Sequence, residues 1–299
     1  MTTLAPSAAA AATTLRFAWF MVLAPAIGTI AAVTLLIVRG TVEPVAIALC
    51  VLFYILGAIG VEVGFHRYFS HRSFKTGRGL RLFMGLCGSA AGQGPVLYWA
   101  AVHRNHHHHT DTERDLHSPI AGGWRGFWSA HVGWLLKMQT IDIAQLTPDL
   151  IKDPTTMTVQ RAYLAAFAAG LIIPAAIGGV VAGPIGMLEG FLWGGLVRVF
   201  ANHHVTWAVN SLCHQFGTRP YQTKDRSGNL AWLALPSFGG AWHNNHHAFP
   251  ASATNDYRWW QLDPAAWFIR AVAALRLAWD VRDGPGAAAL ERRSSYVGR

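Results

Sequence analysis

The chain has 299 residues, of which 52% are hydrophobic and only 13% are charged. This charged share is about half of that in soluble proteins, and the mean hydropathy is +0.27. So few charges cannot cover the surface of a soluble enzyme of this length, which argues against an ordinary cytosolic protein and favours an integral membrane protein. Three cysteines are too few for a disulfide framework. The 15 histidines equal the acidic residues in number.

Four apolar stretches are long enough to cross a bilayer. Residues 1–15 precede them and are expected to form a flexible tail, because no basic segment marks them as a signal peptide. Short breaks separate the first span from the second and the third from the fourth, the latter at Gly183 and Pro184. The sequence therefore predicts two helical hairpins. The predicted spans are residues 17–38, 45–65, 162–182 and 185–210.

The distribution of lysine and arginine predicts the orientation of these spans. Eleven of these residues lie between positions 64 and 161 and ten follow position 214, whereas only Arg39 lies in a loop on the other side. By the positive-inside rule, both termini are expected to be cytoplasmic, together with residues 66–160 and 211–283. The protein is expected to lie in a bacterial inner membrane.

The predicted fold is an all-α integral membrane protein with four transmembrane helices in two hairpins and a cytoplasmic, helical, histidine-rich part that holds two metals. Residues 16–283 are expected to form this single domain, and residues 284–299 a C-terminal tail. The segment 79–102 is apolar but interrupted by glycines and Gln93, so it is interpreted as a buried or interfacial pair of helices.

Most histidines fall into clusters on the predicted cytoplasmic side. The pattern HxxHH occurs twice and places three imidazoles on one face of a helix. His66 and His71 are five residues apart and do not share an α-helical face, so we expect this pair to span a helix end. Asn210 and His214 are four apart and do share a face.

These clusters predict a metal site. Neutral imidazole is the commonest metal ligand in proteins, and eight or nine such nitrogens exceed the four that one zinc ion accepts. Two metals are therefore favoured, although imidazole ligands alone are compatible with iron, zinc, copper or nickel.

Four motifs resemble those of the membrane-bound fatty acid desaturases, specifically the acyl-CoA Δ9 (stearoyl-CoA) branch, in a bacterial form. They are GFHRYFSHRSFK, HRNHH followed by TDTERDLH, TWAVNSLCH and WHNNHHAFP, and the resemblance covers residues 45–282. It implies a di-iron centre and a four-span topology. The ligands carried over by motif are His66, His71, His103, His106, His107, His214, His243, His246 and His247, with Asn210 reaching one metal through water.

The sequence departs from the family pattern beside these ligands. Gly239 and Gly240 stand where relatives often have Gly-Glu, and Glu62 lies one turn before His66. A carboxylate within a span is costly and usually functional, so we hypothesise that Glu62 compensates by hydrogen-bonding a ligand histidine. His203 shares a helical face with Asn210 and is expected to support the ligands.

The resemblance implies O2-dependent desaturation, with O2 as co-substrate and a cis double bond as product. Two electrons must come from an external donor, ferredoxin or a cytochrome b5-type protein, because the chain lacks nucleotide-, haem- and iron–sulfur-binding patterns. By motif position Tyr54 and Ala58 close the acyl tunnel and set chain length, and Trp99 and Trp207 are candidate wall residues.

The expected partners are membrane lipids and a long-chain acyl-CoA or acyl-lipid, and no nucleic acid is expected; the sequence is equally compatible with an acyl-carrier substrate. The net charge of +9 suits both CoA phosphates and an anionic leaflet. A run of basic residues begins directly after His71, the second histidine of the first motif. It is interpreted chiefly as a positive-inside flank of the second span. It consists of Arg72, Lys75, Arg78 and Arg81.

Two other functions compete with desaturation. A related di-iron acetylenase or hydroxylase would use the same metals with a different outcome. A histidine-rich metal transporter is less favoured, because transporters place ionisable ligands near the middle of the membrane, whereas nearly all histidines here lie on predicted cytoplasmic segments.

Overall fold

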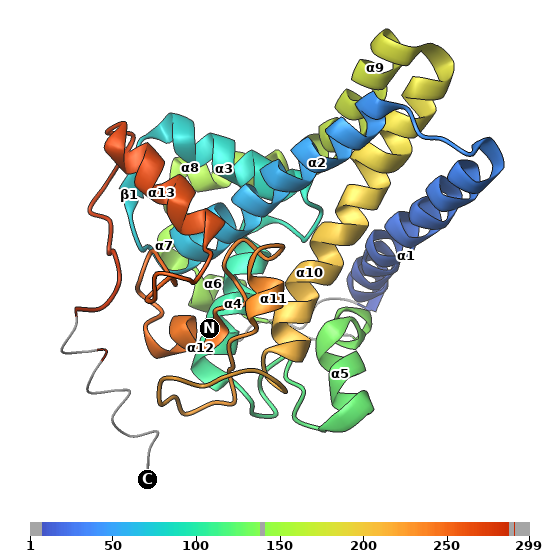
Figure 1. Ribbon diagram of the computed structural model, residues 1–299. Coiled ribbons are helices and arrows are strands. Elements are labelled where there is room, and N and C mark those ends of the chain that lie inside the picture. The colour runs from blue at the N-terminus through green and yellow to red at the C-terminus, as the bar shows by residue number, and fades with distance from the viewer. Residues whose placement is uncertain (1–7, 138–140, 287–289, 291–299) are drawn as a thin grey trace.

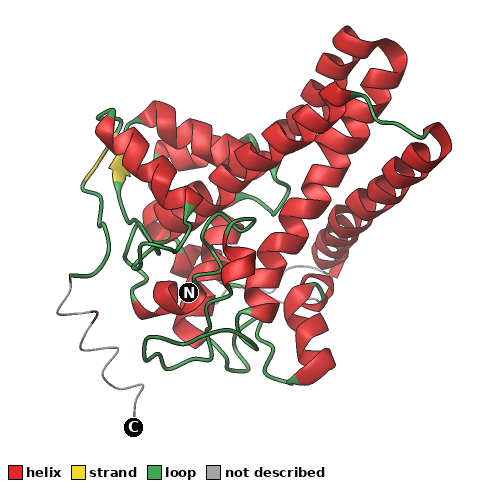
Figure 2. Cartoon of the chain, viewed as in Figure 1, coloured by secondary structure: helices red, strands yellow, loops and turns green. Residues whose placement is uncertain are grey.

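The computed structural model describes residues 8–137, 141–286 and 290. Helices dominate these residues, and one pair of two-residue strands joins antiparallel (Figure 2). The long helices α1, α2, α9 and α10 extend toward one end of the molecule, whereas the shorter helices gather at the other (Figure 1). The elements are α1 (Ala8–Arg39), α2 (Pro44–Ala58), η1 (Ile59–Ser70), β1 (Lys75–Thr76), α3 (Arg78–Ala90), α4 (Val96–His109), α5 (Gly123–His131), η2 (Gly133–Leu136), α6 (Ile143–Leu146), α7 (Pro148–Ile151), α8 (Pro154–Arg161), α9 (Tyr163–Glu189), η3 (Gly190–Val197), α10 (Arg198–Leu212), α11 (Ala231–Ala234), α12 (His243–Ala248), α13 (Pro264–Ala274) and β2 (Ala278–Trp279).

Among the described residues, three helices are long and apolar enough to cross a membrane, namely Leu15–Arg39, Pro44–Ser70 and Tyr163–Leu212. The first helix begins earlier than expected. Residues 8–15 were predicted to belong to a flexible tail, but they continue α1, because their alanines have the highest helix propensity. Residues 1–7 of that tail, and most of the C-terminal tail, lie outside the described residues.

The third apolar helix reverses direction within its 50 residues. The backbone leaves helical geometry at Ala182 and at Gly183, where φ is +65°. Beyond the turn the two arms pack closely: a Cβ on Gly178 would lie 2.1 Å from the carbonyl oxygen of Gly186. The break thus falls where Gly183 and Pro184 predicted it, and the two arms lie antiparallel.

Ionised side chains tie the long helices together. Arg39 and the backbone N–H of Glu43 both donate to the buried carboxylate of Glu189, which joins the α1–α2 loop to α9. The guanidinium of Arg198 is 1% exposed and donates to three backbone carbonyls, at 2.6 Å to Ala90 and 2.8 Å to Gly170 among them. Because burying a cation is costly unless its donors are satisfied, these bonds fix α10 against α3 and α9.

The histidine-bearing end is built on the continuation of α2. At Ile59 the α-helix becomes the π-helix η1, whose buried side chains include Phe65 and Phe69. This helix packs on α3 with backbone in direct contact, since a Cβ on Gly60 would lie 2.0 Å from the nitrogen of Gly88. The segment 79–102, expected to be a helix pair, forms α3 and the first half of α4.

Candidate metal centre

Four segments carry the nine histidines that the motifs singled out. The first ends η1, the second is α4, the third follows α10 and the fourth is α12 (Figure 1). His66 lies in η1 and His71 is the residue that caps its C-terminus, as a pair spanning a helix end. The hydrogen bond from His71 N to the carbonyl of His66 spans five residues. This i→i+5 spacing is that of a π-helix, which brings the two rings within 5.0 Å.

The nine side chains form two groups, each of which offers ligand atoms within 4.8 Å of one another. The five-histidine group consists of His66, His71, His103, His107 and His246. The four-histidine group consists of His106, His214, His243 and His247. A further set, His106, Asp115 and His117, shares its first member with the four-histidine group. The HxxHH repeat of α4 therefore supplies ligands to both groups rather than to one.

The ring nitrogens of these histidines point at one another. In the five-histidine group, Nε2 of His246 lies 2.9 Å from Nε2 of His107 and 3.0 Å from Nε2 of His66. In the four-histidine group, Nε2 of His214 lies 2.9 Å from Nε2 of His243. Lone pairs that converge at such distances repel one another unless protons or a cation lie between them. The donor set therefore fits a metal ion in each group.

Burial, reinforced by the neighbouring histidines, favours the uncharged form of six of the site imidazoles. It lowers the pKa well below the usual histidine range, which favours the neutral form required of a metal ligand. The site histidines for which this holds outside the apolar helices are His71, His103, His107, His243, His246 and His247.

Carboxylates hold the opposite nitrogen, Nδ1, of four of these rings. Such contacts orient the ring so that Nε2 faces the metal. The pairs are Glu62 with His66 at 2.8 Å, Asp115 with His106 at 2.9 Å, Asp111 with His214 at 3.3 Å, and Asp225 with His247 at 3.0 Å. Burial alone would raise the pKa of Asp115, but the adjacent His106 and His117 lower it below its usual value.

Three of these acids were not singled out from the sequence. Asp111 and Asp115 lie in TDTERDLH, shortly after HRNHH. Their short distance in sequence from these histidines could have marked them as hydrogen-bonding partners. Asp225 lies in the loop between α10 and α11, 22 residues before His247, and no local pattern marks it.

The remaining predicted residues lie at various distances from the two groups. Glu62 contacts His66, as hypothesised, and its Oε2 lies 3.2 Å from where a Cβ on Gly240 would be, so it fills the space beside that glycine. Asn210 lies in α10, four residues before His214. His203 hydrogen-bonds the carbonyl of Gly92 at 3.0 Å instead of a ligand.

The position of His203 follows from helix geometry. It precedes His214 by 11 residues, which correspond to about 16 Å along a helix. Only the end of α10 therefore reaches the histidine groups, and His203 packs against Trp207 with ring centroids 5.0 Å apart.

The predicted substrate residues lie along the helices that lead to the site. Trp99 stacks on His103 with ring centroids 5.1 Å apart and donates to Gln93, whose amide in turn donates to Thr206. Tyr54 donates from its hydroxyl to the carbonyl of Pro236 at 2.6 Å. Ala58 is half-buried at the end of α2. The sequence did not single out Gln93 and Thr206 as neighbours of Trp99.

Comparison with known proteins gives the same assignment as the geometry. Residues 43–281 match the family described as fatty acid desaturase. The chain is 42% identical over 267 residues to a hex-5-enoyl-[acyl-carrier protein] acetylenase from Moorena producens, covering 86% of this chain and 83% of the relative.

Two further relatives carry desaturase names. An sn-1 stearoyl-lipid 9-desaturase from Anabaena variabilis is 38% identical, with 77% of this chain and 81% of the relative covered. Delta-9 acyl-lipid desaturase 1 from Arabidopsis thaliana is 36% identical, with 79% of this chain and 75% of the relative covered. The chain therefore belongs to the fatty acid desaturase family, whose members are oxidoreductases that act on fatty acyl chains.

Proposed function

We propose that this chain is an O2-dependent fatty acyl desaturase that holds two iron ions and introduces a cis double bond, at Δ9, into a long-chain acyl group. The observation that supports this most strongly is the convergence of nine imidazoles into two buried groups. Iron with dioxygen supplies an oxidant for an unactivated methylene group, which no protein acid or base provides. Two adjacent methylenes lose one hydrogen each, dioxygen becomes two waters, and two electrons and two protons enter from outside.

The residues of this chain hold and orient that centre. The five-histidine group holds one ion, and the four-histidine group holds the other with Asn210 as an additional ligand through water. The four carboxylates fix Nδ1 of their histidines, so that each Nε2 faces the ion. The electrons come from an external ferredoxin or cytochrome b5-type donor.

We propose that the apolar helices cross the membrane four times, with residues 163–182 and 184–212 as the two arms of the second hairpin. The turn at Gly183 and the lack of basic residues near it support this arrangement. Both termini and the metal centre then face the cytoplasm of a bacterium, with the protein in its inner membrane.

The basic run after the first box favours an acyl-lipid over an acyl-CoA substrate. Three of its four cations pair with acids, which partly neutralises the positive charge that the phosphates of CoA would meet. These pairs are Arg72 with Asp149 at 2.9 Å, Lys75 with Asp280 at 2.8 Å and Arg81 with Asp153 at 3.2 Å. The Anabaena and Arabidopsis relatives are likewise named for lipid-borne chains.

Tyr54→Ala is expected to shift the product toward longer acyl chains. If the Tyr54 ring closes the tunnel, its removal adds room for at least one methylene, which is worth about tenfold in discrimination between neighbouring chain lengths. The measurement is the chain-length distribution of unsaturated fatty acids. Leu52→Ala is the matched control, because Leu52 is 49% exposed on the same helix; an equal shift in both variants would contradict the assignment.

A second candidate activity is triple-bond formation. The 42% identical relative from Moorena producens is named an acetylenase, and both outcomes need the same metal centre. An acetylenase would remove a second pair of hydrogens from a chain that is already unsaturated.

Mass spectrometry of fatty acids from cells that express the chain tests the proposed function and separates these outcomes. A desaturase produces acyl chains that lack two hydrogen atoms. An acetylenase acting on that product removes two more, for a total loss of four, and a hydroxylase adds one oxygen atom. Cells that express the His246→Ala variant provide the blank. An unchanged fatty acid profile, with lipid substrates of several chain lengths supplied, would contradict the proposal.

A further inference from the structure

The two histidine groups differ in how many carboxylates support them. Among the described residues, three of the four histidines in the four-histidine group pair with an acid through Nδ1. In the five-histidine group, only His66 does so, through Glu62 at 2.8 Å. A carboxylate on Nδ1 both orients an imidazole and increases its basicity toward a metal.

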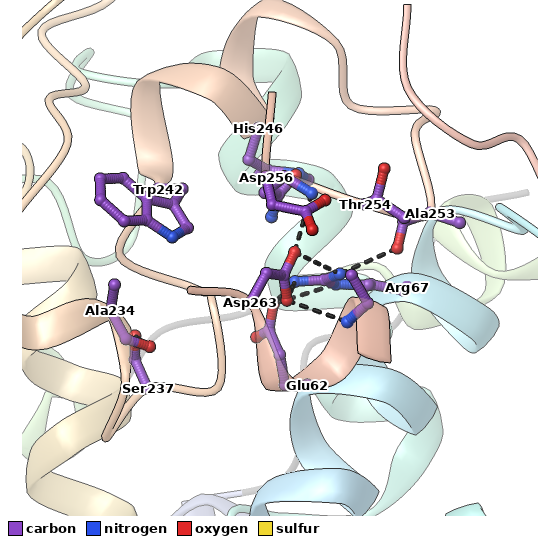
Figure 3. A network of polar contacts seen from close by, with 12 residues as sticks. Glu62, Arg67, Ala234, Ser237, Trp242, His246, Ala253, Thr254, Asp256 and Asp263 are labelled. Carbon is purple, nitrogen blue, oxygen red and sulfur yellow. Dashed lines mark hydrogen bonds and ion pairs between the residues drawn. The ribbon is translucent and has the colours of Figure 1, made fainter. Parts of the chain in front are cut away.

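The single carboxylate of the five-histidine group is also shared with a buried cation. Arg67 donates to Oε1 of Glu62 from Nη2 at 3.2 Å, and to Asp263 from the same nitrogen at 2.9 Å. Figure 3 shows the Arg67 guanidinium between these two carboxylates. Arg67 and Asp263 are 1% and 0% exposed, so little solvent screens the contact.

The acids of the four-histidine group are not ion-paired in this way. Arg219 donates to the backbone carbonyl of Asp225 rather than to its carboxylate. Asp111 accepts the backbone N–H of Arg226 at 2.7 Å, and Asp225 accepts the backbone N–H of Ser227 at 2.9 Å. No lysine or arginine side chain forms an ion pair with Asp111, Asp115 or Asp225 within the part of the chain that the structure describes.

The resulting charges act directly on a divalent ion. The four-histidine group faces three carboxylates that form no ion pair with a described lysine or arginine. Glu62, Arg67 and Asp263 together leave the five-histidine group with one net negative charge. The five-histidine group offers one more imidazole, which strengthens binding there. Coulomb attraction in a buried site is weakly screened, so a tighter four-histidine site requires that the two additional negative charges beside it outweigh that one ligand.

We propose that the two groups are unequal metal sites. The four-histidine group binds a divalent ion first and releases it last, and the weaker five-histidine group depends on the single carboxylate of Glu62. This inference rests on the proposed function, because it requires that both groups bind metal.

The test is the rate at which a chelator removes iron(II) from the full-length, anaerobically loaded protein in detergent. The wild type is expected to release two ions in two phases. Glu62→Gln keeps the shape of the side chain and is expected to accelerate the fast phase by about 10- to 100-fold while leaving the slow phase unchanged. The matched variant Asp225→Asn is expected to accelerate only the slow phase. Size-exclusion elution and circular dichroism establish that each variant is folded.

The outcomes separate this inference from the proposed function. Two ions released at one rate, or a Glu62→Gln variant that accelerates the slow phase, would overturn the inequality and leave the di-metal function intact. A wild-type chain that binds fewer than two ions would overturn the proposed function itself. If Glu62→Gln accelerates only the fast phase and Asp225→Asn only the slow phase, the five-histidine group releases its ion first and the four-histidine group last.

Discussion

Replacing His246 by alanine is expected to reduce bound metal from about two ions per chain to about one and to lower formation of unsaturated acyl chains by more than about 100-fold. The side chain is 1% exposed, and its Nε2 lies within 3.0 Å of ring nitrogens from both η1 and α4. Alanine cannot replace this ligand, so one ion loses a direct bond. Metal analysis and fatty acid profiles of the purified and expressed variant provide the measurement.

His108→Ala is the matched control for this experiment. His108 is exposed on α4, next to His107, but belongs to neither histidine group. Its replacement is expected to leave metal content and product unchanged. A His246→Ala protein with both ions and wild-type turnover would show that His246 is not a ligand.

Gly60→Ala is expected to lower the free energy of unfolding by about 3 kcal/mol, at the upper end for overpacking. The added Cβ would meet the backbone of α3, 2.0 Å from Gly88 N and 2.3 Å from Cys87 C, and backbone atoms cannot move aside as a side-chain tip can. The helices must separate, which displaces η1 and its ligand His66. Thermal unfolding in detergent, together with metal content, measures the effect.

A glycine in an open position provides the comparison. Gly79 lies in the first turn of α3, and a Cβ there would have no atom within 4 Å. Gly79→Ala is expected to be neutral or to stabilise the protein by up to about 1 kcal/mol, because alanine favours the helix. Equal unfolding temperatures for the Gly60 and Gly79 variants would show that the η1–α3 contact does not limit stability.

The sequence predicted most of what depends on local pattern. Uninterrupted apolar runs marked the long helices, and Gly183-Pro184 marked the turn between α9 and its partner arm. The HxxHH spacing placed three imidazoles on each of two helices, and four motifs selected the same nine histidines that the structure gathers.

The π-helix η1 was not predicted. Over only two turns, the spacing of hydrophobic residues does not distinguish a helix with i→i+4 backbone hydrogen bonds from one with i→i+5 bonds. On an α-helix His66 and His71 would diverge, and only the wider ladder aligns them. The extent of α1 was underestimated for a different reason. The polar threonines near its start obscured the helix propensity of the alanines around them.

Contacts between segments far apart in the chain were also beyond prediction. The division of α4's histidines between two groups depends on how α12 and the end of α10 approach it, and Asp225 reaches His247 from a loop without a motif. Glu62 could be singled out because a carboxylate within an apolar run is conspicuous. Its pairing with Arg67 and Asp263 comes from tertiary packing alone.

The continuity of α2 and η1 bears on how a membrane-held substrate would reach the site. A single helical rod runs from Pro44 to Ser70, and the stretch from Pro44 to His66 extends at most about 33 Å, because its π-helical part rises less per residue than an α-helix; this length is comparable to the ~30 Å of a hydrocarbon core. If the rod crosses the bilayer as proposed, His66 lies at the edge of the acyl region. The methylene groups to be oxidised would then have to rise out of the lipid tails to the membrane surface, and a thicker bilayer would lower the histidine groups toward them.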